Sequence, residues 1–363
     1  MAPPMPPLTP PLTPPLTPPL TPPLTPPRAE GPGPNPRRRL WRRGLAWALA
    51  LALGAGLVAC MGKPDVIPDG DPGAAARALG LTLRPLEVEL TAAPGVRLLS
   101  ASALSSESPA FGGLSAIEVS QDGVRIIAIS DAGSWLTARL TRDGTRISGV
   151  IPDGWGALRG PDGAALIDDA RDAEGLALRP DGALSVSFER ENRVSRYDAP
   201  GVSEQVRRRF GEDAGMGLNS GLEALALRPD GALLAVREAG MEDQSAQLAL
   251  ILPPEGAPRE IVLRKPEGLR IVGADIDADG ALWVVRRGFS WLGGFYFDLA
   301  TMAPEGGGYG PPRLLARVQG AGADNAEGLA VWRDDAGATR LLVVSDDNFM
   351  PFQKTVLYEF EVR

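Results

Sequence analysis

The feature that most constrains the fold is a short two-strand unit that recurs along the chain. AEGLALRPDGALSVSFER (173–190) aligns without gaps with LEALALRPDGALLAVREA (222–239), and ADIDADGALWVVRRG (274–288) shares the turn and the second strand. Looser copies occupy 115–133 and 326–348. Apolar residues alternate on both sides of a turn that is Asp-Gly in most copies, which is typical of a β-hairpin because both residues tolerate positive φ. No helical pattern separates the copies, which argues against a βαβ architecture.

Copies of one unit spaced near 50 residues are typical of the blades of a β-propeller. Roughly 280 residues at about 45–50 per blade predict an all-β propeller of about six blades over residues 81–363. The strand-like ends 84–91 (RPLEVELT) and 354–362 (KTVLYEFEV) are expected to pair in one blade and close the ring. A pair of β-sandwiches is the alternative, and the in-phase repeats disfavour it.

The N-terminal part has a different composition. Residues 1–36 are Pro-rich and repeat Leu-Thr-Pro-Pro, so they predict a low-complexity, polyproline-like tail that serves as a spacer or precedes the true start of the protein. The basic cluster RRRLWRR (37–43) and the apolar run 45–59 follow. This run is too short to span the ~30 Å core of a bilayer comfortably, but it has the length of a signal-peptide apolar region.

The apolar run ends in Leu57-Val58-Ala59-Cys60, which matches a bacterial lipobox. Residues 37–60 are therefore predicted to be a lipoprotein signal peptide with Cys60 lipidated, and residues 61–80 a flexible tether. The alternative is an ordinary buried cysteine in a signal anchor. We expect an exported protein that is held at a bacterial membrane through its lipid alone, on the periplasmic or cell-surface side.

Two absences exclude whole classes of site. The chain has no histidine and one cysteine, so a Ser-His-Asp or Cys-His site, a His-ligated zinc or iron site and an intrachain disulfide are all impossible. A metal would have to be held by oxygen ligands, which selects hard cations such as Ca²⁺ or Mg²⁺. An acid or base catalyst would have to be a carboxylate, Lys, Tyr or a metal-bound water.

The charge balance excludes one class of partner. Six arginines and one glutamate precede Cys60, which leaves 31 basic and 44 acidic residues in the remainder, a net charge of −13. This field repels nucleic acid and anionic lipid and favours cations. We expect no nucleic-acid partner, a small-molecule substrate and a monomeric protein.

Acidic residues recur at two positions of the repeated unit. One opens the first strand, and the other lies eight residues after the turn aspartate or at the matching place in the looser copies. The first set is Glu174, Glu223 and Glu327, and the second is Asp131, Glu189, Glu238 and Asp346. If the units are blades, both sets gather on one rim near the axis. Such crowding raises the pKa of each carboxyl unless a cation such as Ca²⁺ is bound.

The alternative is that these acids cap backbone amides and stay solvated. The run Asp275-Ile-Asp277-Ala-Asp279-Gly280 matches the first half of a calcium loop, but its twelfth position is Arg286, so we interpret it as a hairpin with acids on one strand face. Arg190 and Arg287 follow the ends of second strands. They could hold a phosphate group bidentately or simply neutralise the acidic rim.

Five stretches carry a resemblance to the phytase-like esterase family. They are FGGLSAIEVSQDGVRIIAISDAG (111–133), DAEGLALRPDGALSVSFERENRVSRYD (172–198), NSGLEALALRPDGALLAVRE (219–238), VRRGFSWLGGFY (285–296), and DNAEGLAV with LLVVSDDNFMPFQKTVLYEFEV (324–331 and 341–362). The resemblance spans about 110–363 and implies a propeller-like fold, export and a metal-assisted phosphoester hydrolase site.

The resemblance also implies a set of site residues. The acid positions of the family fall on Asp131, Glu174, Glu189, Glu223, Glu238, Glu327, Asp346 and Asp347, and its polar positions on Arg287 and Asn348. The fourth unit departs from this pattern, because Asp275 lies four residues before its turn aspartate, whereas Glu174 and Glu223 lie seven before theirs.

The leading hypothesis is an exported, calcium-assisted hydrolase of phosphoric esters in which the rim acids hold the cation. Its candidate catalytic residues are Glu174, Glu223, Glu327, Arg190 and Arg287. One alternative is a non-catalytic lipoprotein whose propeller binds a ligand or partner with structural calcium. The other is a calcium-dependent lactonase-type propeller.

Overall fold

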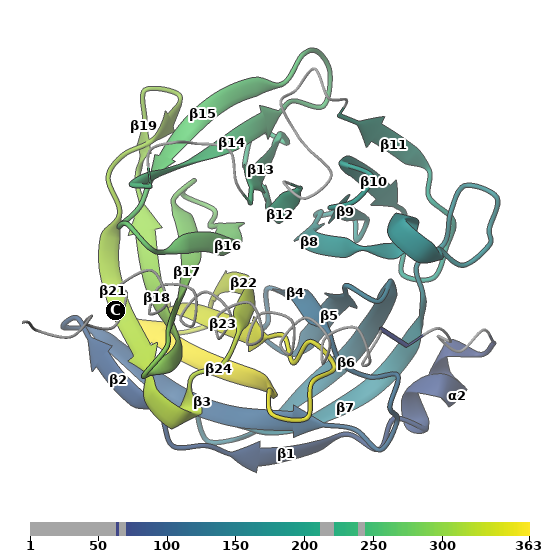
Figure 1. Ribbon diagram of the computed structural model, residues 1–363, viewed down its shortest axis with the longest axis horizontal. Coiled ribbons are helices and arrows are strands. Elements are labelled where there is room, and N and C mark those ends of the chain that lie inside the picture. Colours follow the sequence, from purple (N-terminus) through teal and green to yellow (C-terminus); the bar gives the residue numbers. More distant parts are fainter. Residues whose placement is uncertain (1–62, 65–69, 211–220, 239–243) are drawn as a thin grey trace, which may run out of the picture. The chain divides into compact units, whose positions relative to one another are not determined.

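The computed structural model describes residues 63–64, 70–210, 221–238 and 244–363. The predicted tail, the signal peptide and Cys60 lie outside these residues. Five antiparallel sheets surround a common centre, each with one strand facing the axis and the others further out (Figure 1). The chain is therefore a β-propeller, as the repeats predicted. Among the described residues, no helix is both long and apolar enough to cross a membrane.

Blades 1 to 3 each contain four strands, named in order from the axis outward. Blade 1 consists of β4 (Leu114–Val119), β5 (Arg125–Ser130), β6 (Ser134–Asp143) and β7 (Arg146–Ala157). Blade 2 consists of β8 (Ala173–Leu178), β9 (Leu184–Phe188), β10 (Arg193–Tyr197) and β11 (Val206–Arg209). Blade 3 consists of β12 (Leu222–Leu227), β13 (Leu233–Arg237), β14 (Ala246–Leu252) and β15 (Arg259–Arg264).

Blades 4 and 5 each contain five strands because the N-terminal strands add to them. Blade 4 consists of β16 (Arg270–Ile276), β17 (Leu282–Ser290), β18 (Gly294–Met302), β21 (Arg313–Gln319) and β2 (Glu89–Ala92). Blade 5 consists of β22 (Ala326–Arg333), β23 (Thr339–Ser345), β24 (Thr355–Val362), β3 (Val96–Ser105) and β1 (Thr82–Pro85). The small hairpin β19 (Pro304–Glu305) and β20 (Gly308–Tyr309) lies outside the blades.

The prediction of about six blades was wrong, since the structure has five. That number assumed that all of the roughly 280 residues belong to blades of about 45–50 residues. Part of that length is instead spent on the connection 158–172 between β7 and β8, and part on the N-terminal strands. These strands widen two existing blades and do not form a sixth.

As predicted, an N-terminal strand pairs with the C-terminal strand in one blade, but the N-terminal strand is not the one predicted. β24 pairs with β3, and β1 pairs with β3 at the edge of the same blade. β2 instead pairs with β21 of blade 4. Segment 84–91 is thus divided between two blades. Pro85 ends the edge strand β1, where a residue without an N–H group costs no ladder hydrogen bond. Together these strands join the N-terminal segment to both of the last two blades.

The hydrophobic core is divided into clusters that lie between neighbouring blades. Blades 4 and 5 enclose Phe297 and Tyr358, whose ring centroids are 5.0 Å apart, and the Tyr358 hydroxyl donates to the carbonyl of Gly322 at 2.8 Å. Matching clusters lie between each of the other pairs of neighbours. Each fully buried large side chain contributes roughly 1.5–3 kcal/mol. The ring is therefore held together by packing between blades as well as by hydrogen bonds within them.

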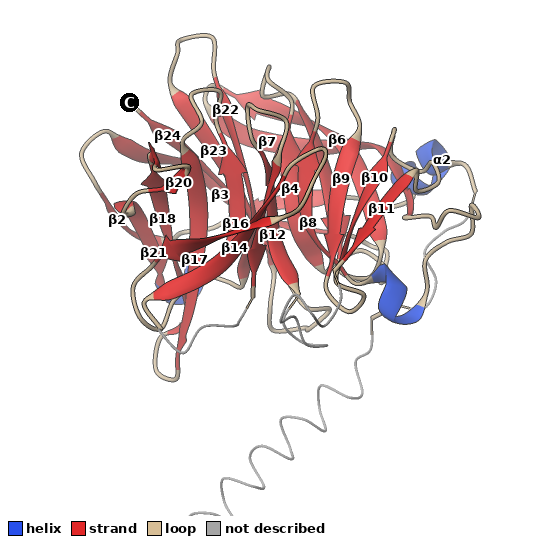
Figure 2. Ribbon diagram, turned by 90° about the horizontal axis from the view of Figure 1, so that it is seen from above, coloured by secondary structure: helices blue, strands red, loops and turns tan. Residues whose placement is uncertain are grey.

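Part of the segment assigned to a tether packs on the ring. Helix α2 (Pro72–Arg77) begins after Asp71, whose side chain accepts a hydrogen bond from the Gly73 amide as a helix cap. Ala76 and Leu79 are fully buried against blade 1. Two short 3₁₀ turns, η1 (Asp168–Arg171) and η3 (Gly320–Gly322), precede the innermost strands of blades 2 and 5. Seen from the side, the strands cross the thickness of the ring (Figure 2).

Candidate functional site

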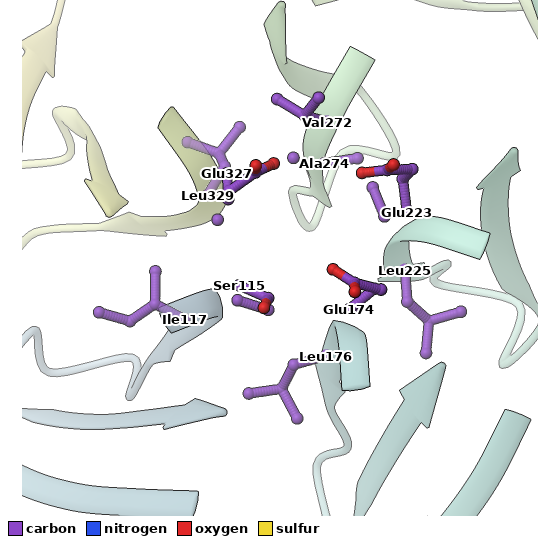
Figure 3. A pocket seen from close by; sticks show the side chains of 15 residues that line it. Ser115, Ile117, Glu174, Leu176, Glu223, Leu225, Val272, Ala274, Glu327 and Leu329 are labelled. Carbon is purple, nitrogen blue, oxygen red and sulfur yellow. The ribbon is translucent and has the colours of Figure 1, made fainter. Parts of the chain in front are cut away.

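Every innermost strand contains a β-bulge at the same place. The pairing register shifts at the matching position of β4, β8, β12, β16 and β22, and in β8 the shift also includes Gly175. The residues at this position are Ser115, Glu174, Glu223, Val272 and Glu327. We call these five residues the inner ring. A bulge re-aims a side chain, and Figure 3 shows the carboxylates of Glu174, Glu223 and Glu327 directed toward the centre.

The inner ring is narrow because small residues follow the bulges. A Cβ atom on Gly273 would lie 2.2 Å from the carbonyl oxygen of Glu327, and one on Gly328 would lie 2.8 Å from the Cα of Ala116. The cavity enclosed by the inner strands has a volume of about 10 Å³, room for roughly one water molecule. The innermost strands thus nearly close the central channel of the propeller. The carboxylates lie at one end of this channel, which we call its mouth.

A second set of side chains surrounds the first. Four of them directly follow the second strand of their blade, and the fifth, from blade 4, lies within β17 opposite the start of β16. They are Asp131, Glu189, Glu238, Arg287 and Asp346, which we call the outer ring. In four blades the backbone amide of this residue donates to the carbonyl of the residue two before the bulge, as from Glu189 to Asp172 at 2.9 Å. The hairpin register therefore places both rings on the same face, which we call the acidic face.

The structure thus brings the sequence-predicted acids of blades 1, 2, 3 and 5 to one mouth of the channel. It adds Asp172, which sequence reasoning missed. Ligand atoms of Asp172, Glu174 and Glu189 all lie within 4.8 Å of one another. Three carboxylate oxygens at this separation could hold one hard cation.

A lysine from the N-terminal segment lies among these acids. The Lys63 ammonium is 3.2 Å from Oδ2 of Asp131, donates to the Asp131 carbonyl at 3.2 Å, and forms an ion pair and hydrogen bond with Asp172. Arg171 holds the same segment by donating to the Pro64 carbonyl at 2.7 Å. The other oxygen of Asp131, Oδ1, is buried and has no hydrogen-bond partner among the described residues. Positive charge is thus already drawn into the cluster.

The arginines predicted to bind substrate are in ion pairs. Arg287 forms a hydrogen-bonded ion pair with Glu327, which also accepts from the side-chain amide of Asn325 at 3.1 Å. Arg190 donates through Nε to Asp172 at 3.2 Å. Arg270, which sequence reasoning also missed, lies 2.7 Å from Glu238.

Eight carboxylates from the two rings and Asp172 therefore face four cationic side chains in the described part of the chain: Lys63, Arg190, Arg270 and Arg287. Burial, together with neighbouring negative charges, raises the pKa values of several of these acids. Burial, opposed by Arg287, raises the pKa of Glu223 to about 7. Burial with the nearby charges of Asp172 and Glu238 raises the pKa of Glu189 to about 7.

The pKa values of two further acids are also raised. Burial raises the pKa of Asp131 to about 6 although the Lys63 charge opposes it. The pKa of Glu174 is well above its usual range because of burial and the charges of Glu223 and Asp172. Carboxyls held in this way gain from a cation, since positive charge restores their ionised form.

Three of the residues predicted for the site, Asp346, Asp347 and Asn348, take part in hydrogen bonds that hold the connection after β23. The Asp347 carboxylate accepts from the amides of Gly113 at 2.9 Å and Phe349 at 3.1 Å, and from the Thr355 hydroxyl at 3.2 Å. Asp346 accepts from the Asn348 amide at 2.6 Å, and Asn348 has a φ of 48°. Asp347 therefore anchors the connection 346–354, and its carboxylate is already engaged there.

Asp275 lies at the opposite mouth of the channel. Its carboxylate accepts from the amides of Val331 and Ile276, both at 2.7 Å, and it influences the pKa of the buried Glu118. Asp277 accepts from the amides of Asp279 and Ala281, both at 3.0 Å. The D-x-D-x-D-G run is thus part of a hairpin, as interpreted from the sequence. Two of its acids accept hydrogen bonds from backbone amides, and the third, Asp279, forms an ion pair with Arg333.

A family model described as "Phytase-like: Esterase-like activity of phytase" matches residues 109–349. No curated protein matches the chain. Among solved structures, the chain is similar to a gluconolactonase from Xanthomonas campestris, with 16% identity, a TM-score of 0.38, and 83% of this chain and 98% of that one covered.

Two other solved structures have a similar likeness. Virginiamycin B lyase from Staphylococcus aureus has 10% identity and a TM-score of 0.39, with 78% of this chain and 100% of that one covered. An aldose sugar dehydrogenase from Streptomyces coelicolor, solved with PQQ bound, has 14% identity and a TM-score of 0.42, with 77% and 100% covered. Likenesses at this level carry no information about the reaction of this chain.

Proposed function

Because the chain belongs to the phytase-like family of esterase-like proteins, we propose that it hydrolyses phosphoric esters with the help of a bound calcium ion. The observation that carries the proposal is the group of Asp172, Glu174 and Glu189, whose ligand atoms lie within 4.8 Å of one another at the mouth of the channel. The family supports a hydrolase-type propeller, and the acids supply the argument for the cation.

The residues of the acidic face fit a hard divalent cation. All the candidate ligands are carboxylate oxygens, which Ca²⁺ prefers. The Lys63 ammonium already lies against Asp131 and Asp172, so this position attracts positive charge. The buried Oδ1 of Asp131 has no partner in the described part of the chain and offers a further oxygen. Asp172, Glu174 and Glu189 would hold the ion, with Asp131 beside them.

A bound divalent cation polarises a phosphoryl oxygen and lowers the pKa of a water that it binds. The protein side chains would do the rest. Arg190 is half-exposed beside Asp172 and can orient the phosphate oxygens. Arg287 is fixed by its ion pair with Glu327 and presents positive charge from the other side of the mouth. Glu223, with a pKa of about 7, suits proton transfer near neutral pH.

The test is hydrolysis by the purified full chain, with calcium or with a chelator. A generic phosphomonoester is followed by release of phosphate, and a phosphodiester by release of its alcohol. We expect turnover that needs calcium and is lost in Glu189→Gln. The matched control is Glu255→Gln, which removes an exposed acid in the β14–β15 turn. Activity that ignores the chelator would refute the metal-assisted mechanism. Calcium that raises the melting temperature without turnover of any ester would instead favour a binding protein.

We also propose that the protein is exported and anchored through Cys60. The support is the order of a basic cluster, an apolar run and Leu-Val-Ala-Cys in the sequence. Cys60→Ser is expected to leave the precursor uncleaved or to release the protein from membranes, measured by its size and by membrane fractionation. A variant that is processed and membrane-bound like the wild type would contradict the lipid anchor.

A further inference from the structure

The most exposed large apolar side chains gather on one face of the propeller. Five of them are more than half exposed in the described part of the chain: Ile167 at 67%, Phe289 at 53%, Trp291 at 88%, Leu292 at 105% and Phe352 at 71%. Four of them lie in connections at the acidic face, namely 158–172, the β17–β18 turn and 346–354, and Phe289 lies at the end of β17 beside that turn. Large apolar side chains that are this exposed on one face favour contact with another surface, and Phe289 and Trp291 already pack on each other there.

The β17–β18 hairpin carries three of these side chains beyond the ring. β16 begins at Arg270, opposite Arg287, but the β17–β18 ladder continues for three further pairs, to Ser290 and Gly294. At about 3.4 Å per residue, the tip extends roughly 10 Å past the start of the innermost strand. Phe289 stacks edge-to-face on Trp291 with ring centroids 5.7 Å apart. The tip is therefore an ordered aromatic projection with Leu292 at its end.

The chain that leads to the predicted lipid ends on this same face. Lys63 is fixed to Asp131 and Asp172, and Cys60 precedes it by three residues. Three residues span at most about 11 Å. A lipid on Cys60 would therefore bring the acidic face, and not the opposite one, close to the bilayer.

We propose that the acidic face docks on the surface of a lipid bilayer, with the tip 288–293 and Phe352 as its interfacial contacts. Trp and Phe are enriched at the membrane–water interface, where a ring can contact both acyl chains and head groups. The net charge of −13 after Cys60 gives no attraction to anionic lipid, so the contact depends on these apolar side chains. Neutral, zwitterionic lipid is the matching partner.

Tryptophan fluorescence can test this contact selectively. The other tryptophans of the described residues, Trp135, Trp155, Trp283 and Trp332, are buried. The full chain is reconstituted in phosphatidylcholine vesicles with plain or brominated acyl chains, and the wild type is compared with Trp291→Phe. Any signal from Trp41 and Trp47 is common to both proteins and cancels in the difference.

We expect brominated lipid to remove most of the emission that distinguishes the wild type from Trp291→Phe. The control is a tryptophan on the opposite face, Val124→Trp in the Trp291→Phe background, which should not be quenched because Val124 lies in the β4–β5 turn. Unchanged thermal unfolding of each variant shows that it is folded. A vesicle-bound protein whose Trp291 emission is unquenched would overturn the proposal and leave a protein partner as the occupant. The readout does not depend on catalysis.

Discussion

Lys63→Gln removes the positive charge that the N-terminal segment places in the acidic cluster. The wild-type ammonium contacts Asp131 and Asp172, while Arg171 holds the neighbouring carbonyl of Pro64 at 2.7 Å. Glutamine keeps most of the length of the side chain and can still donate one hydrogen bond. The substitution therefore tests the charge of Lys63 and leaves the packing of the segment nearly unchanged.

The size of the effect follows from how deeply the ion pairs are buried. Breaking a fully buried pair costs about 3–5 kcal/mol, and an exposed pair is worth about 0–1 kcal/mol. The Lys63 side chain is 35% exposed, and the carboxylates of Asp131 and Asp172 are 13% and 7% exposed. Solvent therefore screens the lysine end, and we expect a loss of about 1–2 kcal/mol without calcium.

Calcium should reverse the sign of this effect. The ion and Lys63 both need Asp172, so binding of the ion must displace the ammonium. A docking free energy of about 1–2 kcal/mol weakens apparent calcium binding by about 5–30-fold. Lys63→Gln is therefore expected to bind calcium more tightly by that factor, although it is less stable in chelator.

Thermal unfolding in chelator and across a calcium titration measures both effects, and calorimetry gives the affinity directly. The control is Lys354→Gln, which removes another lysine of the acidic face, one whose side chain forms no ion pair with either ring in the described part of the chain. It should change neither quantity. Equal destabilisation with and without calcium, together with an unchanged calcium affinity, would refute the idea that Lys63 occupies the position of the ion.

Two other predictions concern the channel. Burial raises the pKa of Asp275 to about 7, so its contribution to stability is present below the unfolded value of about 3.9 and is lost as the pH rises through 7. The unfolding free energy of Asp275→Asn minus that of the wild type should therefore increase by up to about 4 kcal/mol between pH 4 and pH 8, measured by denaturant unfolding. A difference that stays constant with pH would contradict this. Gly273→Ala should lower the unfolding free energy by about 1–3 kcal/mol, because its Cβ would lie 2.2 Å from the Glu327 carbonyl. Gly308→Ala is the control, since its nearest contact would be 3.8 Å away, and equal losses would contradict the argument.

The repeat made most of the fold predictable. The alternation in 173–190 and 222–239 predicts β8, β9, β12 and β13 where the structure has them. Apolar residues at every second position determine which face of a strand is buried. The blade count was not predictable in this way. β1, β2 and β3 belong to no copy of the repeat, and their pairing with blades 4 and 5 depends on contacts far apart in the chain.

The candidate site was predictable only where it follows the repeat. Glu174 and Glu223 align in the sequence, so their meeting at the channel mouth follows from the hairpin register. Asp172 precedes its strand at a place where blade 3 has Gly221, so alignment gives no signal for it. Lys63 reaches the same carboxylate from 109 residues away, outside every repeat. Such a contact depends on tertiary structure and leaves no local pattern.

The departures from fivefold symmetry decide where a cation can bind. A propeller with the same two acids in all five blades would attract an ion equally from every side. Blade 1 instead contributes Ser115 to the inner ring. Blade 4 contributes Val272 to the inner ring and Arg287 to the outer ring, and Arg287 forms an ion pair with Glu327 of blade 5. At blade 2, ligand oxygens of Glu174, Glu189 and Asp172 lie within 4.8 Å of one another, close enough to share one ion. We therefore expect the cation off the axis at blade 2, with an anionic substrate group between it and Arg287. The repeated unit thus forms the ring of blades, and the blades that depart from it place the expected cation site off the axis.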